Sequence, residues 1–411
     1  MQRRAFYFAM AAYLLFCGIA FVRFFPFARG EIFSSDAAVY SQGAIHLLQS
    51  GFYSSDGVHP LFSREPGMSL FLAAVYAIFG IENAYALFLV QATLYYCSVL
   101  WFCRSLRNVF GERVAALCFF LLLTYVSVFH TIFSAYRECF ALVLLLSFAS
   151  LFLSFLRDRT MLKALASGAV LGGVILTYSS FLLFPFFLAV VLWRHRIRFR
   201  EAVILVVLPF VVVAPWFIRN AQYGRAAQTE VLQRMTYVWY VRAEQAEKVH
   251  GLEPLRCLWS EYVSRDWSGR SDACSFNGVK NREWPRGVPN GNEAQVARVS
   301  QLRIVHSLPS YLWFSVFEIL ELHLPYVGGG WSFAFNLGAS VAAFFLYLGC
   351  FLGMPFLFHQ RSTLFVALML YHTLFFIFTD ATPRYLLPIL FCYTVFAAYG
   401  YERLLHWYRH R

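Results

Sequence analysis

The chain has 411 residues, of which 60% are hydrophobic and only 14% are charged. An average soluble domain has about 25% charged residues, so this composition excludes an ordinary soluble globular protein. The net charge of +12 lies in short loops between apolar runs, which is typical of a membrane protein and disfavours nucleic-acid binding. The first apolar run, residues 5–22, follows Arg3 and Arg4. We interpret it as a retained membrane helix rather than a cleaved signal peptide.

Ten apolar runs are predicted to cross a membrane as helices, since about 30 Å of hydrocarbon requires roughly 20 helical residues. The fold class that they predict is an all-α polytopic membrane protein. A single helix over residues 164–193 would place arginines on the wrong face, so a turn at 177–180 is expected to divide it. The predicted spans are 5–22, 84–103, 114–133, 139–156, 164–178, 181–193, 202–218, 333–358, 363–379 and 385–401.

One shorter apolar stretch, residues 67–80, decides the topology. If it does not cross the membrane, every strongly basic loop falls on the same side as the N-terminus, as the positive-inside rule requires. If it crosses, the arginines of residues 104–113 and all later loops move to the wrong side. We therefore predict an interfacial helix at 67–80, ten spans, and both termini in the cytoplasm.

This topology predicts three regions. A transmembrane module over residues 1–218 includes the first outer loop, 23–83, and a short outer turn at 134–138. Residues 219–332 form a small polar domain on the outer face. Residues 333–411 hold the C-terminal transmembrane helices.

The outer domain has its own predicted features. Residues 226–250 and 293–306 are predicted to be helical, and residues 308–322 to form an amphipathic helix on the membrane surface. Cys257 and Cys274 lie in the polar part of this region, where an oxidising compartment would allow them to pair.

The predicted spans contain no acidic or basic residue. Ion-coupled transporters usually place ionisable side chains near the middle of the membrane, so this pattern disfavours a secondary transporter. Polar chemistry is therefore expected at the outer interface, where four clusters of charged residues fall.

The first cluster opens the loop 23–83. Asp36 is followed by apolar residues at helical spacing, including Tyr40 and Ala44, and Gly51 provides a natural end to the helix. Two interpretations of Asp36 stay open. It either caps this helix or accepts a proton from an attacking hydroxyl group.

The second and third clusters each contain an arginine beside a glutamate. Arg64 and Glu65 precede Pro66 and the interfacial helix. Arg64 either binds a phosphate through paired hydrogen bonds or forms an ordinary surface pair with Glu65. Arg137 and Glu138 lie in the short turn 134–138 and either anchor helix ends or face a site.

The fourth cluster lies at the outer ends of two predicted spans. Arg219 follows the seventh span, and Arg384 and Tyr385 open the tenth. They are either interfacial anchors or part of a site. His59 and His130 have no partner at metal-ligand spacing, so we assign no metal and no other cofactor, with a divalent cation left open.

In this order, the clusters resemble the GT-C superfamily of membrane glycosyltransferases. The family-39-type enzymes, which are related to protein O-mannosyltransferases and to the aminoarabinose transferases of lipid A, share the most features. The resemblance covers residues 1–225 and 363–405. The matching residues are Asp36, Tyr40 and Ala44 in the first loop, Arg64-Glu65-Pro66, Phe79-Gly80, Glu138, Gly168, Gly172-Gly173, Pro215-Trp216, Arg219-Asn220 and Pro383-Arg384-Tyr385. Tyr178 stands where the family often has a basic residue.

The resemblance implies an inverting glycosyltransferase in a bacterial inner membrane, using a polyprenyl-phosphate sugar and an acceptor that is a lipid, a glycan or a protein. Asp36 would be the general base, and Glu138 would position the acceptor or tune Asp36. Arg64, with Arg137 or Arg384, would neutralise the phosphate. The further substrate-binding candidates are Tyr40, Glu65, Tyr178, Arg219 and Tyr385. The alternatives are a polymerase or ligase that uses a polyprenyl-diphosphate glycan, and a non-enzymatic lipid-carrier flippase.

Overall fold

The computed structural model describes residues 32–33, 36–62, 64–125, 128, 131–224, 309, 311–312, 315, 333–377 and 383–409. These residues are helical or in connecting turns, with one isolated β-bridge between Ser54 and Pro60. The all-α prediction is therefore confirmed for them. The predicted span 5–22 and both cysteines of the outer domain lie outside the described residues, as do the helices expected at 226–250 and 293–306.

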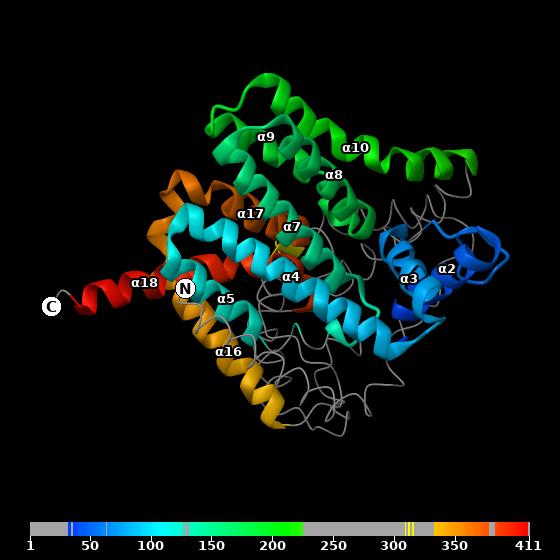
Figure 1. Cartoon of the computed structure of the whole chain (residues 1–411), viewed down its shortest axis with the longest axis horizontal. Helices are drawn as coiled ribbons and strands as arrows, with labels where there is room; N and C mark the ends of the chain where they lie inside the picture. Colours follow the sequence, from blue (N-terminus) through cyan, green and yellow to red (C-terminus); the bar gives the residue numbers. More distant parts are fainter. Residues whose placement is uncertain are drawn as a thin grey trace. The chain divides into compact units, whose positions relative to one another are not determined.

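The chain divides into two compact units. The first falls within residues 1–218, 333–372 and 387–411, and the second within 219–332 and 373–386. The helices that build the units are shown in Figure 1. In chain order they are α2 (Asp36–Ser50), α3 (Pro66–Phe79), α4 (Ala84–Phe110), α5 (Glu112–Thr124), α7 (Arg137–Asp158), α8 (Met161–Thr177), the 3₁₀ turn η1 (Ser179–Phe181), α9 (Phe184–Arg194), α10 (Phe199–Gln222), α16 (Phe333–Leu352), η2 (Met354–Phe358), η3 (Gln360–Ser362), α17 (Thr363–Ile377), η4 (Pro383–Ile389) and α18 (Leu390–Arg409).

Three of the described helices, α4, α7 and α10, are long and apolar enough to cross a membrane. They coincide with the predicted spans 84–103, 139–156 and 202–218. The predicted division of 164–193 is also present, because α8 ends at Thr177 and α9 begins at Phe184. With 17 and 11 residues, these two helices are short for a bilayer.

Other predicted spans differ in their boundaries from the helices. The helix expected over 114–133 ends at Thr124, whose hydroxyl donates to the carbonyl of Phe120 while Tyr125 takes an extended backbone conformation. The helix expected over 333–358 stops at Leu352, and the chain continues as a 3₁₀ turn with Pro355 in its first turn. A proline cannot donate a backbone hydrogen bond, so it favours a break at this point.

The last predicted span, 385–401, is also displaced. Its first residues form the 3₁₀ turn η4, which contains Pro388, and the α-helical part begins at Leu390. The helix then continues to Arg409, beyond the predicted end. An apolar run ends where charged residues begin, but the helix does not, because Glu, Arg and Leu all favour helices.

Small residues allow α16 and α18 to touch at the backbone. A Cβ atom added to Gly400 would lie 2.2 Å from the carbonyl oxygen of Gly349, and one added to Gly353 would lie 2.2 Å from that of Phe396. Membrane helices commonly associate through such glycine contacts, since close approach maximises van der Waals packing. In turn, α18 packs on α5, and α7 packs on both α4 and α8.

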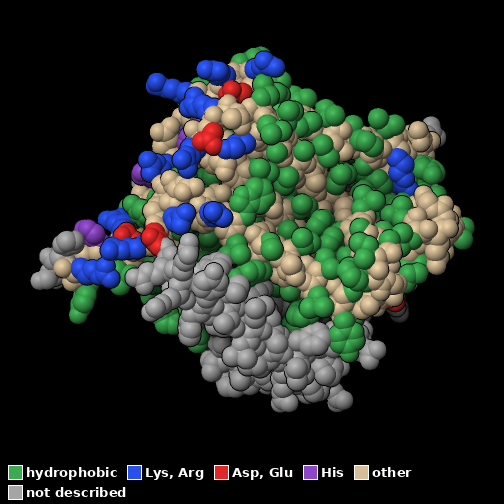
Figure 2. Space-filling view, in the orientation of Figure 1, with side chains coloured by type: hydrophobic (Ala, Val, Ile, Leu, Met, Phe, Trp, Pro, Cys, Tyr) green, Lys and Arg blue, Asp and Glu red, His purple; other side chains and the backbone are tan. Residues whose placement is uncertain are grey.

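The basic loops of the first unit meet at one end of its helices. Figure 2 shows most of the visible Lys and Arg side chains gathered along one edge of the molecule. Contacts between loops distant in sequence confirm that they are neighbours. They are Arg361 Nη1 to the carbonyl of Val109 (2.7 Å), Gln360 Nε2 to that of Arg194 (3.1 Å), Arg159 Nη2 to that of His195 (3.3 Å), and the ion pair of Arg113 with Glu402 (3.7 Å).

We call these basic loops, which contain Arg113, Arg159, Arg194 and Arg361, the basic rim. The helix α3 begins and ends away from it. Its N-terminal neighbour Glu65 contacts Arg137 at the start of α7. The next helix begins on the same side, because Gln91 of α4 donates to the carbonyls of Ile132 and Ser134 at 3.2 and 3.0 Å. The 22 residues of α7, roughly 33 Å of helix, separate this end from the basic rim. The arrangement agrees with a non-crossing helix at 67–80.

Candidate active site

The helix α2 places Asp36 at one edge of the site. Asp36 is its first residue, and the helix ends at Ser50, where Gly51 takes a positive φ of 68°. Glycine adopts this conformation without the steric cost that other residues incur. The face of α2 that carries Tyr40 and Ala44 is buried, and α2 packs along α3.

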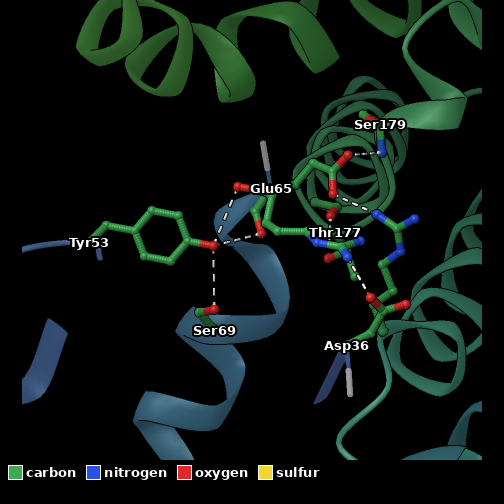
Figure 3. A network of polar contacts seen from close by, with 9 residues as sticks. Asp36, Tyr53, Glu65, Ser69, Thr177 and Ser179 are labelled. Carbon is green, nitrogen blue, oxygen red and sulfur yellow. Dashed lines mark hydrogen bonds and ion pairs between the residues drawn. The ribbon is translucent and has the colours of Figure 1, made fainter. Parts of the chain in front are cut away.

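Tyr53 fixes the chain that leads into α3. Its hydroxyl lies 3.3 and 3.2 Å from the carbonyl oxygens of Arg64 and Glu65, and 3.4 Å from the hydroxyl of Ser69 (Figure 3). Its ring meets Trp216 of α10 edge-on, with the ring centroids 5.5 Å apart. The buried Tyr53 therefore sets the backbone from which the two charged side chains of the second cluster extend.

Arg64 and Glu65 each reach a different partner. The Arg64 guanidinium donates to the carboxylate of Asp36 across 28 positions of sequence. The Arg64 side chain is 15% exposed and that of Asp36 is 26% exposed. The guanidinium also lies 5.7 Å from the centre of the Tyr40 ring. The predicted general base and the predicted phosphate ligand are therefore in contact.

Glu65 joins α3 to the N-terminus of α7. Its Oε2 accepts a hydrogen bond of 2.6 Å from Arg137, and its Oε1 accepts one of 3.3 Å from the backbone N–H of Ser179. Glu65 does not cap α3, because its side chain makes no capping bond there. On the other side, the Arg137 guanidinium lies 4.3 Å from the centre of the Tyr178 ring. Such a contact stabilises the cation through the ring quadrupole.

Gly67 permits this geometry. A Cβ atom at this position would lie 2.4 Å from the hydroxyl of Thr177 and 2.6 Å from the carbonyl oxygen of Leu176. The first turn of α3 therefore lies directly against the last turn of α8. This contact brings Glu65 within reach of Ser179, which follows α8 in the chain.

Tyr40 lies in the middle of the charged cluster. Its side chain is 1% exposed, and its hydroxyl has no hydrogen-bond partner among the described residues. Burial raises the pKa of the phenol to about 12, with partial opposition from the Arg137 guanidinium. Tyr40 therefore keeps its proton at ordinary pH, and its hydroxyl is suited to donate a hydrogen bond to an anionic or sugar oxygen.

Glu138 follows Arg137 in the first turn of α7 and is 2% exposed. Its charge acts on Tyr40, together with the charges of Arg64, Glu65 and Arg137. The structure thus brings seven predicted site residues into one cluster. They are Asp36, Tyr40, Arg64, Glu65, Arg137, Glu138 and Tyr178.

The remaining predicted residues belong to the second unit. Arg219 donates to the side-chain oxygen of Asn220 at 2.9 Å and lies over the ring of Tyr223. Tyr385 stacks on Phe376, with centroids 5.4 Å apart. The side chain of Arg384 lies outside the described part of the chain. A role for these residues in the site stays a prediction.

Sequence reasoning missed three contributors to this cluster. Tyr53 and Ser179 act through a hydroxyl and a backbone N–H, and neither carries a charge that singles it out. Gly67 follows Pro66, and its sequence position indicates only the start of an apolar helix. A glycine in the first turn of such a helix is a usable signal, because it often marks a close approach of two backbones.

Metal-binding geometry is not found within the described ranges, where no three His, Cys, Asp or Glu side chains group around one point. His59 instead contacts Asp56 at 2.8 Å, at the tip of the loop between α2 and α3. In the cluster itself, carboxylates face guanidinium groups in charge-assisted hydrogen bonds, and guanidinium groups are also suited to bind phosphate.

The fold and the site together define a helical membrane protein with a cluster of paired charges at one end of an apolar bundle and a basic rim at the other. No protein-family model and no curated protein sequence matches the chain. The oligosaccharyltransferase of Archaeoglobus fulgidus in its apo form is similar in structure, with a TM-score of 0.52 and 14% identity, over 98% of this chain and 51% of that one. This likeness shows a shared fold, and the GT-C resemblance is confirmed at that level.

Two further solved structures are similar at lower scores. The oligosaccharyltransferase AglB of the same organism, in complex with an inhibitory peptide and a dolichol-phosphate, has a TM-score of 0.48 and 14% identity, covering 90% of this chain and 47% of that one. ArnT from Cupriavidus metallidurans, bound to undecaprenyl phosphate, has a TM-score of 0.41 and 14% identity, covering 90% and 73%. The chain thus spans about half the length of the oligosaccharyltransferases that it matches.

Proposed function

We propose that the chain is an inverting glycosyltransferase that moves a sugar from a polyprenyl-phosphate carrier to an acceptor hydroxyl at the outer membrane face. The observation that carries this proposal is the meeting of Asp36, Arg64–Glu65 and Arg137, from three separate segments, at one end of an apolar bundle. Apolar helices suit the chain of a lipid-linked phosphate, and guanidinium groups suit its headgroup because they bind phosphate through paired hydrogen bonds. The fold shared with an oligosaccharyltransferase supports the same reaction class.

In the proposed mechanism, Asp36 removes the proton of the acceptor hydroxyl. The hydroxyl oxygen then attacks the anomeric carbon from the side opposite the phosphate. The bond between that carbon and the phosphate oxygen breaks, and the configuration inverts. The leaving polyprenyl phosphate takes the bonding electron pair, and Arg64 and Arg137 stabilise its charge. Positioned cations of this kind act on the charge that develops in the transition state.

The remaining residues of the cluster have supporting roles in this proposal. Glu65 and Tyr178 orient Arg137 from two sides. The buried hydroxyl of Tyr40 donates to a donor-substrate oxygen, and Glu138 positions the acceptor or tunes the base. Arg219, Arg384 and Tyr385 are kept as candidate substrate-binding residues.

The membrane placement follows from the charges. The basic rim is proposed to face the cytoplasm, as the positive-inside rule requires. The cluster around Asp36 then faces outward, with ten spans and both termini inside. A bacterial inner membrane is the proposed location. The proposed partners are the polyprenyl-phosphate sugar, membrane lipid, and an acceptor that is a lipid, a glycan or a protein.

Substrate discrimination by the purified protein tests the proposal. Lipid-linked sugars that accumulate in a deletion strain, identified by mass spectrometry, supply the candidate donor substrate. Transfer from the monophosphate-linked sugar, with an inverted anomeric product, is the expected result. Exclusive use of a diphosphate-linked glycan would instead show a polymerase or ligase. Lipid transport in proteoliposomes without any glycosylated product would show a flippase.

A further inference from the structure

The two arginines of the site differ in how firmly they are held. Arg137 donates to Glu65, whose other oxygen accepts from the backbone N–H of Ser179. The Arg137 guanidinium also lies 4.3 Å from the centre of the Tyr178 ring. Moving Arg137 would therefore disturb contacts among three segments. Its pair with Glu65 holds these segments together and is expected to stay intact when a ligand binds.

The contacts of Arg64 leave it easier to move. It pairs with Asp36, and its distance to the centre of the Tyr40 ring is 5.7 Å, near the outer limit for a cation–π contact. The Asp36 side chain is about twice as exposed as that of Glu65, at 26% against 13%. The Arg64 and Arg137 side chains are about equally exposed, at 15% and 14%. A ligand that approaches from solvent therefore reaches the carboxylate of Asp36 more readily than that of Glu65.

This pairing has a chemical consequence for Asp36 as a base. A guanidinium in contact with a carboxylate favours the ionised form and so makes the carboxylate a weaker proton acceptor. A phosphate that binds Arg64 neutralises that cation and adds a second negative charge beside Asp36. Both effects raise the proton affinity of Asp36, and thus its strength as a base.

We propose that the phosphate of the donor substrate and the carboxylate of Asp36 compete for Arg64. Binding of the lipid phosphate takes Arg64 from Asp36 and converts Asp36 from a charge partner into an active base. This inference rests on the proposed function, because it requires an anionic lipid phosphate at the site. It predicts that the lipid substrate binds before the acceptor is deprotonated, so that the base is strong only when a sugar is present to transfer.

Linkage gives the competition a measurable sign. If phosphate binding raises the proton affinity of Asp36 by some factor, then protonation of Asp36 must strengthen phosphate binding by the same factor. Asn at this position imitates the uncharged, protonated carboxyl group. The Asp36→Asn variant should therefore bind the lipid more tightly, although it cannot act as a base. A carboxylate that only maintained the structure of the pocket would give the opposite result when removed.

The test uses the full-length protein in nanodiscs and a polyprenyl monophosphate without a sugar as the probe. We expect D36N to bind at least about fivefold more tightly than the wild type, the lower end of typical coupling between sites. Arg64→Gln should bind more weakly than the wild type. The double variant D36N/R64Q should bind no more tightly than R64Q, because the gain in D36N acts through Arg64.

Asp56→Asn is the matched control. Asp56 lies in the loop between α2 and α3, where its Oδ1 accepts hydrogen bonds from the backbone N–H groups of Val58 and His59. Asparagine at this position preserves an acceptor. We expect D56N to bind the lipid with the affinity of the wild type. If D56N binds as tightly as D36N, general charge repulsion explains the gain and the proposed competition for Arg64 is wrong. If D36N binds the lipid no more tightly than the wild type, and Asp36→Ser gives the same result, the proposed competition for Arg64 is wrong. The proposed function would not be affected by that result. Absence of binding by the wild type would contradict the proposed lipid substrate as well.

Discussion

The two ends of α7 carry arginines in contrasting environments. At the N-terminal end, Arg137 pairs with Glu65, which is 72 positions away, and the two side chains are 14% and 13% exposed. At the C-terminal end, Arg157 pairs with its neighbour Asp158 at 3.6 Å, and the two side chains are 66% and 45% exposed. Exposed pairs contribute about 0–1 kcal/mol, whereas the part-buried pair of Arg137 and Glu65 joins two segments that are distant in sequence. One helix thus carries an exposed pair of neighbouring residues at one end and, at the other, a part-buried pair that belongs to the candidate site.

The largest expected contrast is between carboxylates at the two ends. Replacing Asp36 with asparagine should reduce sugar transfer by about 10²–10⁴-fold, since a positioned general base typically contributes that much. Asp158, which contacts Lys163 at the basic rim, is the matched control, and D158N should keep wild-type transfer. Initial rates per folded molecule measure both. Near-normal transfer by D36N would reject Asp36 as the base.

The arginines of α7 should differ in their contribution to stability. Arg137→Gln leaves the part-buried Glu65 carboxylate without its cation. Loss of one partner of a fully buried pair costs about 3–5 kcal/mol, so we expect a cost of roughly 1–3 kcal/mol here. Arg157→Gln removes an exposed pair and should cost less than about 1 kcal/mol. Denaturation of both variants in the same detergent gives the comparison. Equal losses would show that the two ends do not differ as described.

The approach of α3 to α8 can be tested with a methyl group. Gly67→Ala places a Cβ 2.6 Å from the Leu176 carbonyl oxygen, and overpacking of this kind costs about 1–3 kcal/mol. Because Glu65 is displaced, the rate of sugar transfer by G67A should fall even under conditions in which the variant remains folded. Gly173→Ala is the control, because its Cβ would meet only Leu144, at an ordinary 3.9 Å. Wild-type transfer by G67A would show that the close approach of α3 to α8 is not needed for activity.

The smallest effect on folding is expected at Tyr40. Because its buried hydroxyl has no partner among the described residues, Tyr40→Phe should leave stability unchanged or improve it by about 1 kcal/mol. Burial raises the pKa of the Tyr40 phenol from 10.0 to about 12. Between these pH values the unfolded chain has lost this proton and the folded chain still holds it, so the free energy of unfolding falls as the pH rises from 10 toward 12. Y40F should therefore lose less stability across that interval. Slower transfer by a stable Y40F would support a hydrogen bond from this hydroxyl to the substrate.

Much of the fold could be predicted from the sequence because charge and apolar length are local properties. The position of α3 followed from the distribution of arginines, and the division near Thr177 followed from the same argument. The irregular ends could not be predicted in this way. The early end of α5 at Thr124 and the 3₁₀ turn before Leu390 lie inside apolar sequence, where hydropathy gives no sign of a break.

The site was predicted in part for a related reason. Charged residues such as Asp36 and Arg137 are conspicuous in an apolar chain, so the sequence points to them directly. Their partners are not fixed by local sequence, because Arg64 and Glu65 are adjacent and yet reach different helices. The packing of α3 against α2 and α8 determines which carboxylate meets which guanidinium.

The most direct test of the central claim is the side of the membrane on which each end of the bundle lies. Val58→Cys would place a thiol in the loop between α2 and α3, at a position that is 73% exposed. Arg107→Cys would place one in the exposed basic rim. In intact cells, a membrane-impermeant thiol reagent should label V58C above the wild-type background and should label R107C only in inverted vesicles. Labelling of R107C from outside, with V58C protected, would contradict the account.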